Sequence, residues 1–196
     1  MHYLPRSVPT AVALMFIGAA LAMAQTPQTR EGFWISFGTG LGLASFGCHG
    51  CDTLRPEPNG IGPTLHLRLG GTFSPQVLIG IELNTWHKFS EGVKASAGVL
   101  TSVFYVYPRA AERFFFKIGL GPAAYAADDG TDRFTSLGYS LIGGVGWDHR
   151  IGRAVSITPV VYVTYGGIGD WRRNRMFVAH GFRQAWIELG AGLTFH

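Results

Sequence analysis

Apolar and polar residues alternate with a period of two over residues 184–196 of the chain. One face is wholly apolar and consists of Ile187, Leu189, Ala191, Leu193 and Phe195. The other face mixes an indole, a carboxylate, glycines and a hydroxyl, at Trp186, Glu188, Gly190, Gly192 and Thr194. A period of two predicts a β-strand. Because the wholly apolar face is the wrong one for contact with water, we expect it to face lipid in a transmembrane barrel.

The same alternation, bounded by turn residues, recurs along the chain. It predicts eight strands, at 32–46, 61–73, 77–88, 95–107, 113–126, 136–148, 154–166 and 184–195. Short connections at 74–76, 108–112 and 149–153 alternate with mostly longer ones at 47–60, 89–94, 127–135 and 167–183. This pattern is typical of outer-membrane barrels and puts both chain ends on the periplasmic side. The sequence therefore predicts an all-β fold, an eight-stranded antiparallel up-and-down transmembrane β-barrel.

Two hairpins can be aligned so that their side chains sort by face. In the first, Arg68 is placed opposite Glu82, with aliphatic pairs outward on either side. In the second, Phe104 is placed opposite Lys117, which would turn Tyr105 outward. The outer face should also carry an aromatic girdle near the short-turn ends, formed by Phe33, Tyr107, Phe114, Trp147 and Phe195.

Two prolines fall inside predicted strands, Pro122 in the fifth and Pro159 in the seventh. Proline has no N–H group to donate to a neighbouring strand. We therefore expect a bulge or a local break in the strand pairing at each proline.

The interior of an eight-stranded barrel is just wide enough for side chains or for one small ligand, which excludes a porin-type channel. The predicted inward residues are Trp34, Ser36, His66, Arg68, Glu82, Asn84, Trp86, Phe104, Lys117, Ser140, Thr158, Tyr162 and Glu188. Four of them, Arg68, Glu82, Lys117 and Glu188, form a charge network of balanced sign. Such a network can be read as an acid/base or proton-conducting site, but we favour pairing of buried charges that fill the lumen.

The first residues of the chain have the order of a secretory signal peptide. Residues 1–24 contain Arg6, an apolar run too short for a spanning helix, and the small residues Ala22 and Ala24 before the expected cleavage site. Residues 25–196 then form one barrel domain. With 16 Lys and Arg against 12 Asp and Glu, and no long basic tract, the composition argues against nucleic-acid binding.

Two of the predicted loops carry candidate chemistry. Cys48 and Cys51 lie in the first long loop of an exported chain, which favours a disulfide over a partial metal site or a redox motif. Arg172, Arg173 and Arg175 lie in the last long loop and would bind phosphate or sulfate groups. Lipopolysaccharide or another polyanion is the natural partner, and a simple solvated loop is the alternative.

With its signal peptide, eight alternating strands, unequal connections and final Gly-Leu-Thr-Phe, the chain resembles the small eight-stranded outer-membrane β-barrels of the OmpA-like and OmpX-like kind over residues 32–196. The resemblance implies a bacterial outer-membrane location and recognition of the closing strand by the barrel-assembly machinery. Members of the family act as structural proteins, adhesins, resistance factors or, less often, lipid enzymes.

We interpret the chain as a non-enzymatic outer-membrane barrel of structural or surface-interaction type, monomeric and without a cofactor. A first alternative is a lipid A-modifying enzyme, a deacylase or acyltransferase. Deacylases on such barrels carry a His-x-Ser dyad, and His66, His87 and His180 are not followed by one. A second alternative is a soluble lipocalin-like carrier, which would turn the apolar faces inward and the charged residues outward.

Overall fold

The protein is all-β in the part of the chain that the computed structural model describes, which is residues 30–48, 59–90 and 92–196 without the side chain of Ile168. The strands are β1 (Phe33–Cys48), β2 (Gly60–Ser74), β3 (Val77–Ser90), β4 (Val93–Val106), β5 (Phe114–Asp128), β6 (Arg133–Trp147), β7 (His149–Arg150), β8 (Val155–Arg173) and β9 (Met176–Phe195). None of these residues forms a helix long and apolar enough to cross a membrane. The predicted signal peptide lies outside the described residues.

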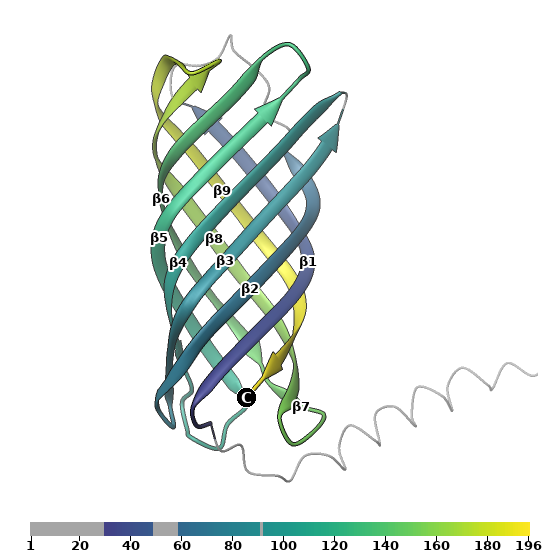
Figure 1. Ribbon diagram of the computed structural model, residues 1–196, viewed down its shortest axis with the longest axis vertical. Helices are drawn as coiled ribbons and strands as arrows, with labels where there is room; N and C mark the ends of the chain where they lie inside the picture. The colour runs from purple at the N-terminus through teal and green to yellow at the C-terminus, as the bar shows by residue number, and fades with distance from the viewer. Residues whose placement is uncertain (1–29, 49–58, 91) are drawn as a thin grey trace, which may run out of the picture.

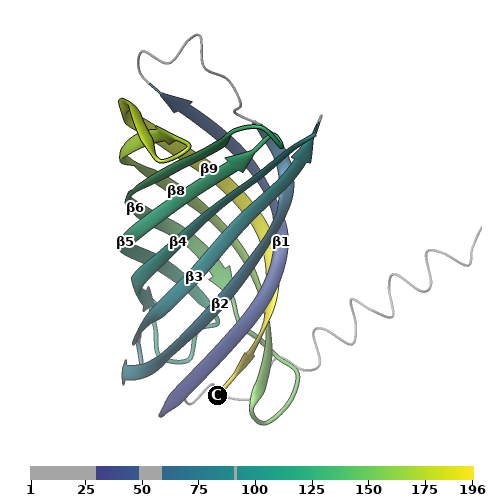
Figure 2. The ribbon, with the colours of Figure 1, turned by 45° about the horizontal axis from the view of Figure 1, so that its top comes forward.

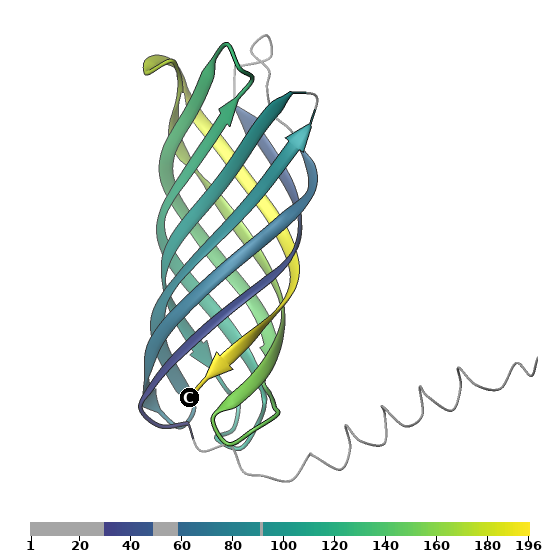
Figure 3. The ribbon, with the colours of Figure 1, turned by 45° about the vertical axis from the view of Figure 1, so that its right-hand side comes forward.

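The strands close into a barrel (Figures 1 and 3). Each long strand pairs antiparallel with its neighbours in the order β6, β5, β4, β3, β2, β1, β9, β8, and a pairing between β6 and β8 completes the ring. The two-residue strand β7 continues the line of β6 against the start of β8. The predicted eight-stranded antiparallel barrel is therefore confirmed. We call the end where β1 begins and β9 ends the terminal end, and the opposite end the distal end.

The outer surface is apolar and the lumen holds the charges. On β3, the side chain of Leu83 faces out with 42% exposure, whereas its neighbour Glu82 is fully buried. Arg68, Lys117 and Glu188 are buried in the same way. A soluble lipocalin-like carrier would have the reverse arrangement, so that alternative is wrong.

The first predicted hairpin register is confirmed and the second is wrong by one residue. Arg68 faces Glu82 as expected. In the second hairpin Lys117 faces Tyr105, so Tyr105 is 3% exposed in the lumen and Phe104 is 46% exposed on the outer surface. A shift of one residue reverses every face of a strand. This register lets the Tyr105 hydroxyl donate a hydrogen bond to a lumen carboxylate, whereas Phe104 has no polar atom and suits the lipid-facing surface. In the same register Tyr107 faces inward, so it is not part of the predicted outer girdle.

Glycines on the inner face admit the large lumen side chains. A Cβ added to Gly38 would lie 2.2 Å from Nε2 of His66, and one added to Gly146 would lie 2.2 Å from the ring of Phe115. These contacts are closer than any real side chain permits, so the rings occupy the space that the glycines leave free. Each of these rings therefore lies over the glycine that is its direct partner on the neighbouring strand.

Strand pairing is locally broken at both prolines, as predicted. The pairing between β4 and β5 stops at Ala123 and resumes at Leu120, on either side of Pro122. The partners of β8 on its other side change from β6 to β7 around Pro159, which remains paired with Ala191 of β9. Neither break shifts the register of its strand pair.

Three of the predicted long connections at the distal end are shorter than expected. β3 extends to Ser90 and β4 begins at Val93, and only residues 129–132 link β5 to β6. β8 and β9 continue to a two-residue turn at Asn174 and Arg175, where a loop over 167–183 was expected. Figures 1 and 2 show this extension, which we call the distal hairpin (residues 167–183), at the end opposite the C-terminus. Its glycines and register shifts interrupt the alternation, so the sequence did not show that β8 and β9 continue here.

Candidate functional site

Mid-barrel, the lumen holds a group of charged and polar side chains that we call the charged layer: His66, Arg68, Glu82, Asn84, Lys117 and Glu188. Glu82 is its centre and accepts hydrogen bonds from Nζ of Lys117 at 2.5 Å and from the hydroxyl of Tyr105 at 2.6 Å. Nε of Arg68 lies 3.4 Å from Glu82, which is an ion pair without hydrogen-bond geometry. The structure therefore brings three of the four predicted charges into direct contact.

Glu188, the fourth predicted charge, pairs with a histidine instead. Its Oε1 lies 3.2 Å from Nδ1 of His66. Asn84 accepts a hydrogen bond from the hydroxyl of Tyr162 at 2.7 Å, and Nζ of Lys117 lies 3.6 Å from the centre of the Tyr162 ring. Carboxylates, cations and phenols thus bind one another across the lumen, an arrangement that fills space and fixes side chains.

At the terminal end a second polar cluster crosses the lumen. The guanidinium of Arg30, just before β1, donates to the carbonyl oxygens of Ala110 and Glu112 and lies 3.4 Å from the centre of the Tyr107 ring. Asp148 accepts hydrogen bonds from the hydroxyl of Tyr107 at 2.6 Å and from that of Thr158 at 2.8 Å. The sequence reading missed Arg30 and Asp148 because both lie outside the predicted strands or at their ends.

The distal half of the lumen is aromatic, and we call it the aromatic layer: Phe46, Trp86, Tyr125, Phe134, Trp171, Phe182 and Trp186. Trp171 stacks on Phe182 with ring centres 4.6 Å apart, and Phe182 in turn lies 4.8 Å from Tyr125. Trp171 was expected in a loop but is completely buried. The distal hairpin therefore contributes to the core as well as to the surface.

The three predicted arginines of the distal hairpin have different surroundings. Arg173 binds Asp132 in the neighbouring turn, and NH2 of Arg172 lies 4.0 Å from Asp170. Arg175 is exposed and has no charged partner among the described side chains. The hydrogen bond from Arg173 lowers the pKa of Asp132 below its usual range, and the same contact raises the pKa of Arg173. The arginine cluster is thus partly neutralised by carboxylates of its own chain.

The histidines contact either a carboxylate or a hydroxyl, which is only part of a catalytic triad. His180 binds Asp170 at 2.8 Å on the surface of the distal hairpin, and Nε2 of His87 lies 3.1 Å from the hydroxyl of Thr85. Within the described ranges, no histidine is hydrogen-bonded both to a hydroxyl and to a carboxylate. Nucleophilic catalysis by a triad needs both partners in reach.

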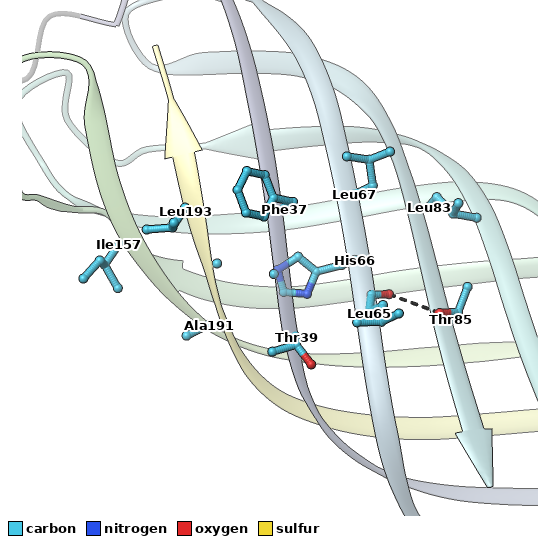
Figure 4. A pocket seen from close by; sticks show the side chains of 12 residues that line it. Phe37, Thr39, Leu65, His66, Leu67, Leu83, Thr85, Ile157, Ala191 and Leu193 are labelled. Carbon is cyan, nitrogen blue, oxygen red and sulfur yellow. Dashed lines mark hydrogen bonds between the residues drawn. The ribbon is translucent and has the colours of Figure 1, made fainter.

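A shallow hollow of about 680 Å³ lies on the outer face of the barrel (Figure 4). Leu67, Leu83 and Leu193 stand around it, and His66 lies behind the strands on the lumen side. The hydroxyl of Thr85 at its edge donates to a backbone carbonyl, so it offers lipid no free polar donor. This hollow therefore belongs to the apolar surface and is not a polar ligand site.

Only one of the two cysteines of the predicted disulfide lies among the described residues. Cys48 ends β1 and is paired in register with Phe182 of β9. Cys51 lies outside the described residues, so the predicted disulfide between the two stays a prediction.

Comparison with known proteins establishes the fold. No family model matches the chain, and no curated protein matches it by sequence. Among solved structures, Neisserial surface protein A is similar with a TM-score of 0.55 at 14% identity, over 86% of this chain and 99% of that one.

Two further solved structures are similar to the chain. Ail, the attachment invasion locus protein of Yersinia pestis, matches with a TM-score of 0.53 at 13% identity, over 84% of this chain and 99% of that one. The outer membrane protein OprG from Pseudomonas aeruginosa matches with a TM-score of 0.50 at 14% identity, over 88% and 100%. The chain therefore has the fold of the small outer-membrane β-barrels, as its sequence predicted.

Proposed function

We propose that this chain, an eight-stranded β-barrel of the outer-membrane type, is a non-enzymatic surface protein with a closed lumen. The distal hairpin would face the cell exterior and bind polyanions such as lipopolysaccharide phosphates. The termini would then lie in the periplasm, after removal of residues 1–24, and the closing strand would be recognised by the barrel-assembly machinery. We expect a monomer, with Cys48 and Cys51 joined in the exterior loop.

The packing of the lumen supports the closed state. Side chains cross it at three levels, the terminal cluster of Arg30 and Asp148, the charged layer and the aromatic layer. The cavity between the first two levels measures about 20 Å³, enough for a water molecule and too small for a solute path. A diffusion channel would need a continuous opening of larger size.

The exposed cations of the distal hairpin carry the binding proposal. Arg175 lies at the tip, with a positive φ of 73° that holds it within the two-residue turn. Arg172 is 56% exposed, and the neighbouring side chains of Met176 and Phe177 are exposed as well. Guanidinium groups beside apolar side chains suit the boundary between lipid phosphates and sugars.

The name of one similar structure agrees with this role. Ail of Yersinia pestis is called an attachment invasion locus protein, a name that describes contact with an external partner. For the present chain the arginines themselves, not the shared fold, support the proposal.

The proposal is tested by binding to vesicles that contain lipopolysaccharide, with soluble heparin as a lipid-free polyanion. Because both arginines are exposed, each contact contributes up to about 1 kcal/mol, and the double variant Arg172→Ala/Arg175→Ala should weaken binding by up to about thirtyfold. Added salt should have the same direction of effect. Binding to both probes points to a general polyanion site, whereas binding to the vesicles alone points to lipopolysaccharide.

The matched control is Arg153→Ala, which removes an exposed arginine at the terminal end. It should leave binding unchanged. Arg173→Ala should have a smaller effect than the double variant because Asp132 already binds that guanidinium. Unchanged binding in the double variant would contradict the proposal.

A further inference from the structure

The barrel wall is interrupted at one seam near the distal end. β6 and β8 pair from Gly146–Val160 to Ser140–Gly166 and again at Thr135–Arg172 and Phe134–Arg173. Between these stretches the pairing is lost and the register shifts. The two strands are therefore joined above and below a short unpaired segment of the wall.

The β8 side of the seam is irregular in its own right. Its pairing with β9 shifts register around Gly167, Gly169 and Trp171. At Gly169 an added Cβ would lie 2.3 Å from the hydroxyl of Ser136 on β6, so only glycine fits there. Glycines and lost ladder bonds lower the cost of opening a wall at this place.

Several buried polar atoms near this seam or in the aromatic layer lack a hydrogen-bond partner among the described residues. Gln184 is 3% exposed, and both its amide oxygen and its amide nitrogen lack a hydrogen bond among the described residues. The indole N–H groups of Trp171 and Trp186 are likewise buried and unpaired there. An unpaired buried amide or indole is unfavourable, so a residue that adds two such atoms needs another reason to be present.

A small cavity connects the amide with the seam. It measures about 10 Å³ and is bounded by Ser136, Gly169, Phe182 and Gln184, with Tyr139 on the outer side. That volume is close to the minimum for one water molecule. A larger ligand would enter only if the seam widened and Phe182 or the distal hairpin moved.

We propose that the aromatic layer is a binding site for a small neutral aromatic molecule with a hydroxyl or carbonyl oxygen, entered through the seam between β6 and β8. The rings of Trp171 and Phe182 would stack on the ligand ring. The amide of Gln184 can both donate to and accept from its oxygen substituent, and the indole N–H groups can only donate.

The outer mouth of the seam indicates where the ligand comes from. Leu137 and Tyr139 of β6 are exposed there, on the same apolar surface as the lipid-facing side chains. A ring with one polar group resembles the tyrosine and tryptophan side chains that gather at membrane interfaces. Such a molecule would reach the seam from the lipid interface. The site is independent of the polyanion contact proposed for the arginines.

The test compares benzyl alcohol with toluene, which lacks the oxygen, on the refolded full-length protein in lipid vesicles. Tryptophan fluorescence reports binding, because three of the chain's five tryptophans lie in the aromatic layer. The wild type should bind benzyl alcohol more tightly than toluene. Gln184→Leu should weaken binding of benzyl alcohol about three- to tenfold and leave toluene unchanged.

Gln184→Leu should also raise the midpoint of thermal unfolding without ligand, because it removes two unpaired polar atoms from the core. A gain in stability with a loss of binding separates a functional residue from a structural one. If Gln184→Leu does not fold, Gln184→Met is the second variant for the same measurements, because it also removes the amide. Failure of the wild type to bind benzyl alcohol, or equal preference in wild type and variant, would mean that the amide only holds water and would overturn the proposal.

Discussion

The charged layer and the aromatic layer of the lumen differ in how their buried polar groups are bound. In the charged layer Glu82 is bound by Lys117, Tyr105 and Arg68. Some atoms of Arg68, His66, Asn84 and Glu188 lack a hydrogen bond among the described residues, but each of these side chains keeps a charged or polar partner through another atom or an ion pair. In the aromatic layer the amide of Gln184 lies buried without a hydrogen bond in the described part of the chain. Side chains that bind one another across a barrel make it rigid. Unpaired polar groups beside an interrupted wall contribute little to stability, so that part of the barrel can change conformation more easily. We infer that stability resides mid-barrel and adaptability at the distal end.

The largest effect is expected for Glu82→Gln, which removes the anion from the charged layer. Lys117 and Arg68 would stay buried without their counter-charge, and such a loss costs about 3–5 kcal/mol. Urea unfolding of the protein in lipid vesicles measures the change. As a control, Glu112→Gln breaks a pair with the exposed Arg109 and should cost about 0–1 kcal/mol. Similar losses for both variants would contradict a stabilising charged layer.

A second prediction contrasts the two faces of β3 at one depth. Leu83 follows Glu82 in sequence but faces lipid, so Leu83→Lys places a charge in the hydrocarbon and should cost about 2–4 kcal/mol. The same unfolding assay measures it. Thr131→Lys, in an exposed turn at the distal end, should leave the stability nearly unchanged. Equal tolerance at both positions would argue against lipid on the outer face.

A third prediction uses two threonines of β8 that differ in hydrogen bonding. The hydroxyl of Thr158 donates to Asp148 at 2.8 Å and contacts that of Thr194, so Thr158→Val should lower stability by about 1–3 kcal/mol. The hydroxyl of Thr164 is buried and unpaired among the described residues. Thr164→Val keeps the shape and should leave stability unchanged or raise it. A loss of stability in Thr158→Val together with no loss in Thr164→Val would show that the hydrogen bonds of Thr158 stabilise the barrel, and equal losses would contradict this.

The period of two in the sequence was sufficient to predict the barrel and the orientation of most strands. It placed Arg68 opposite Glu82 because a charged pair between aliphatic pairs has only one register that keeps its faces uniform. It failed for Phe104 and Tyr105, because two adjacent aromatic residues suit either face. Only the contact between the Tyr105 hydroxyl and Glu82 decides which of them turns inward.

The distal end was the least predictable part, for a physical reason. Glycines at 166, 167 and 169 and the arginines that follow look like a loop, yet bulges keep this segment in β8 while they shift its register. Such bulges leave no periodic signal in a sequence. The pairing of Arg173 with Asp132 depends on the contact between two turns and was likewise not visible in advance.

The smallest expected effect concerns the ion pair between Arg173 and Asp132, which we call the tie because it joins the two distal turns. Arg173 hydrogen-bonds to Asp132 and thereby lowers its pKa below the usual 3.8. A carboxyl group whose pKa is lower in the folded state stabilises the fold above its unfolded pKa, and this contribution disappears as the pH falls through the folded value. The tie should therefore hold at neutral pH and weaken only in acid below about pH 3.8. Because Arg173 is exposed and the pair lies at the surface between two turns, the effect should be local to the hairpin.

Titration of the carboxyl carbons by NMR in wild type and Arg173→Ala measures the tie directly. Replacing Arg173 should move the midpoint of Asp132 upward, since its main hydrogen-bond donor is lost. Asp129 in the same turn is the matched control. Its pKa is lowered chiefly by backbone N–H groups of Asp132 and Thr131, so its midpoint should move little. An unchanged midpoint for Asp132, or equal shifts for both carboxyl groups, would show that Arg173 does not tie the distal hairpin to its neighbour.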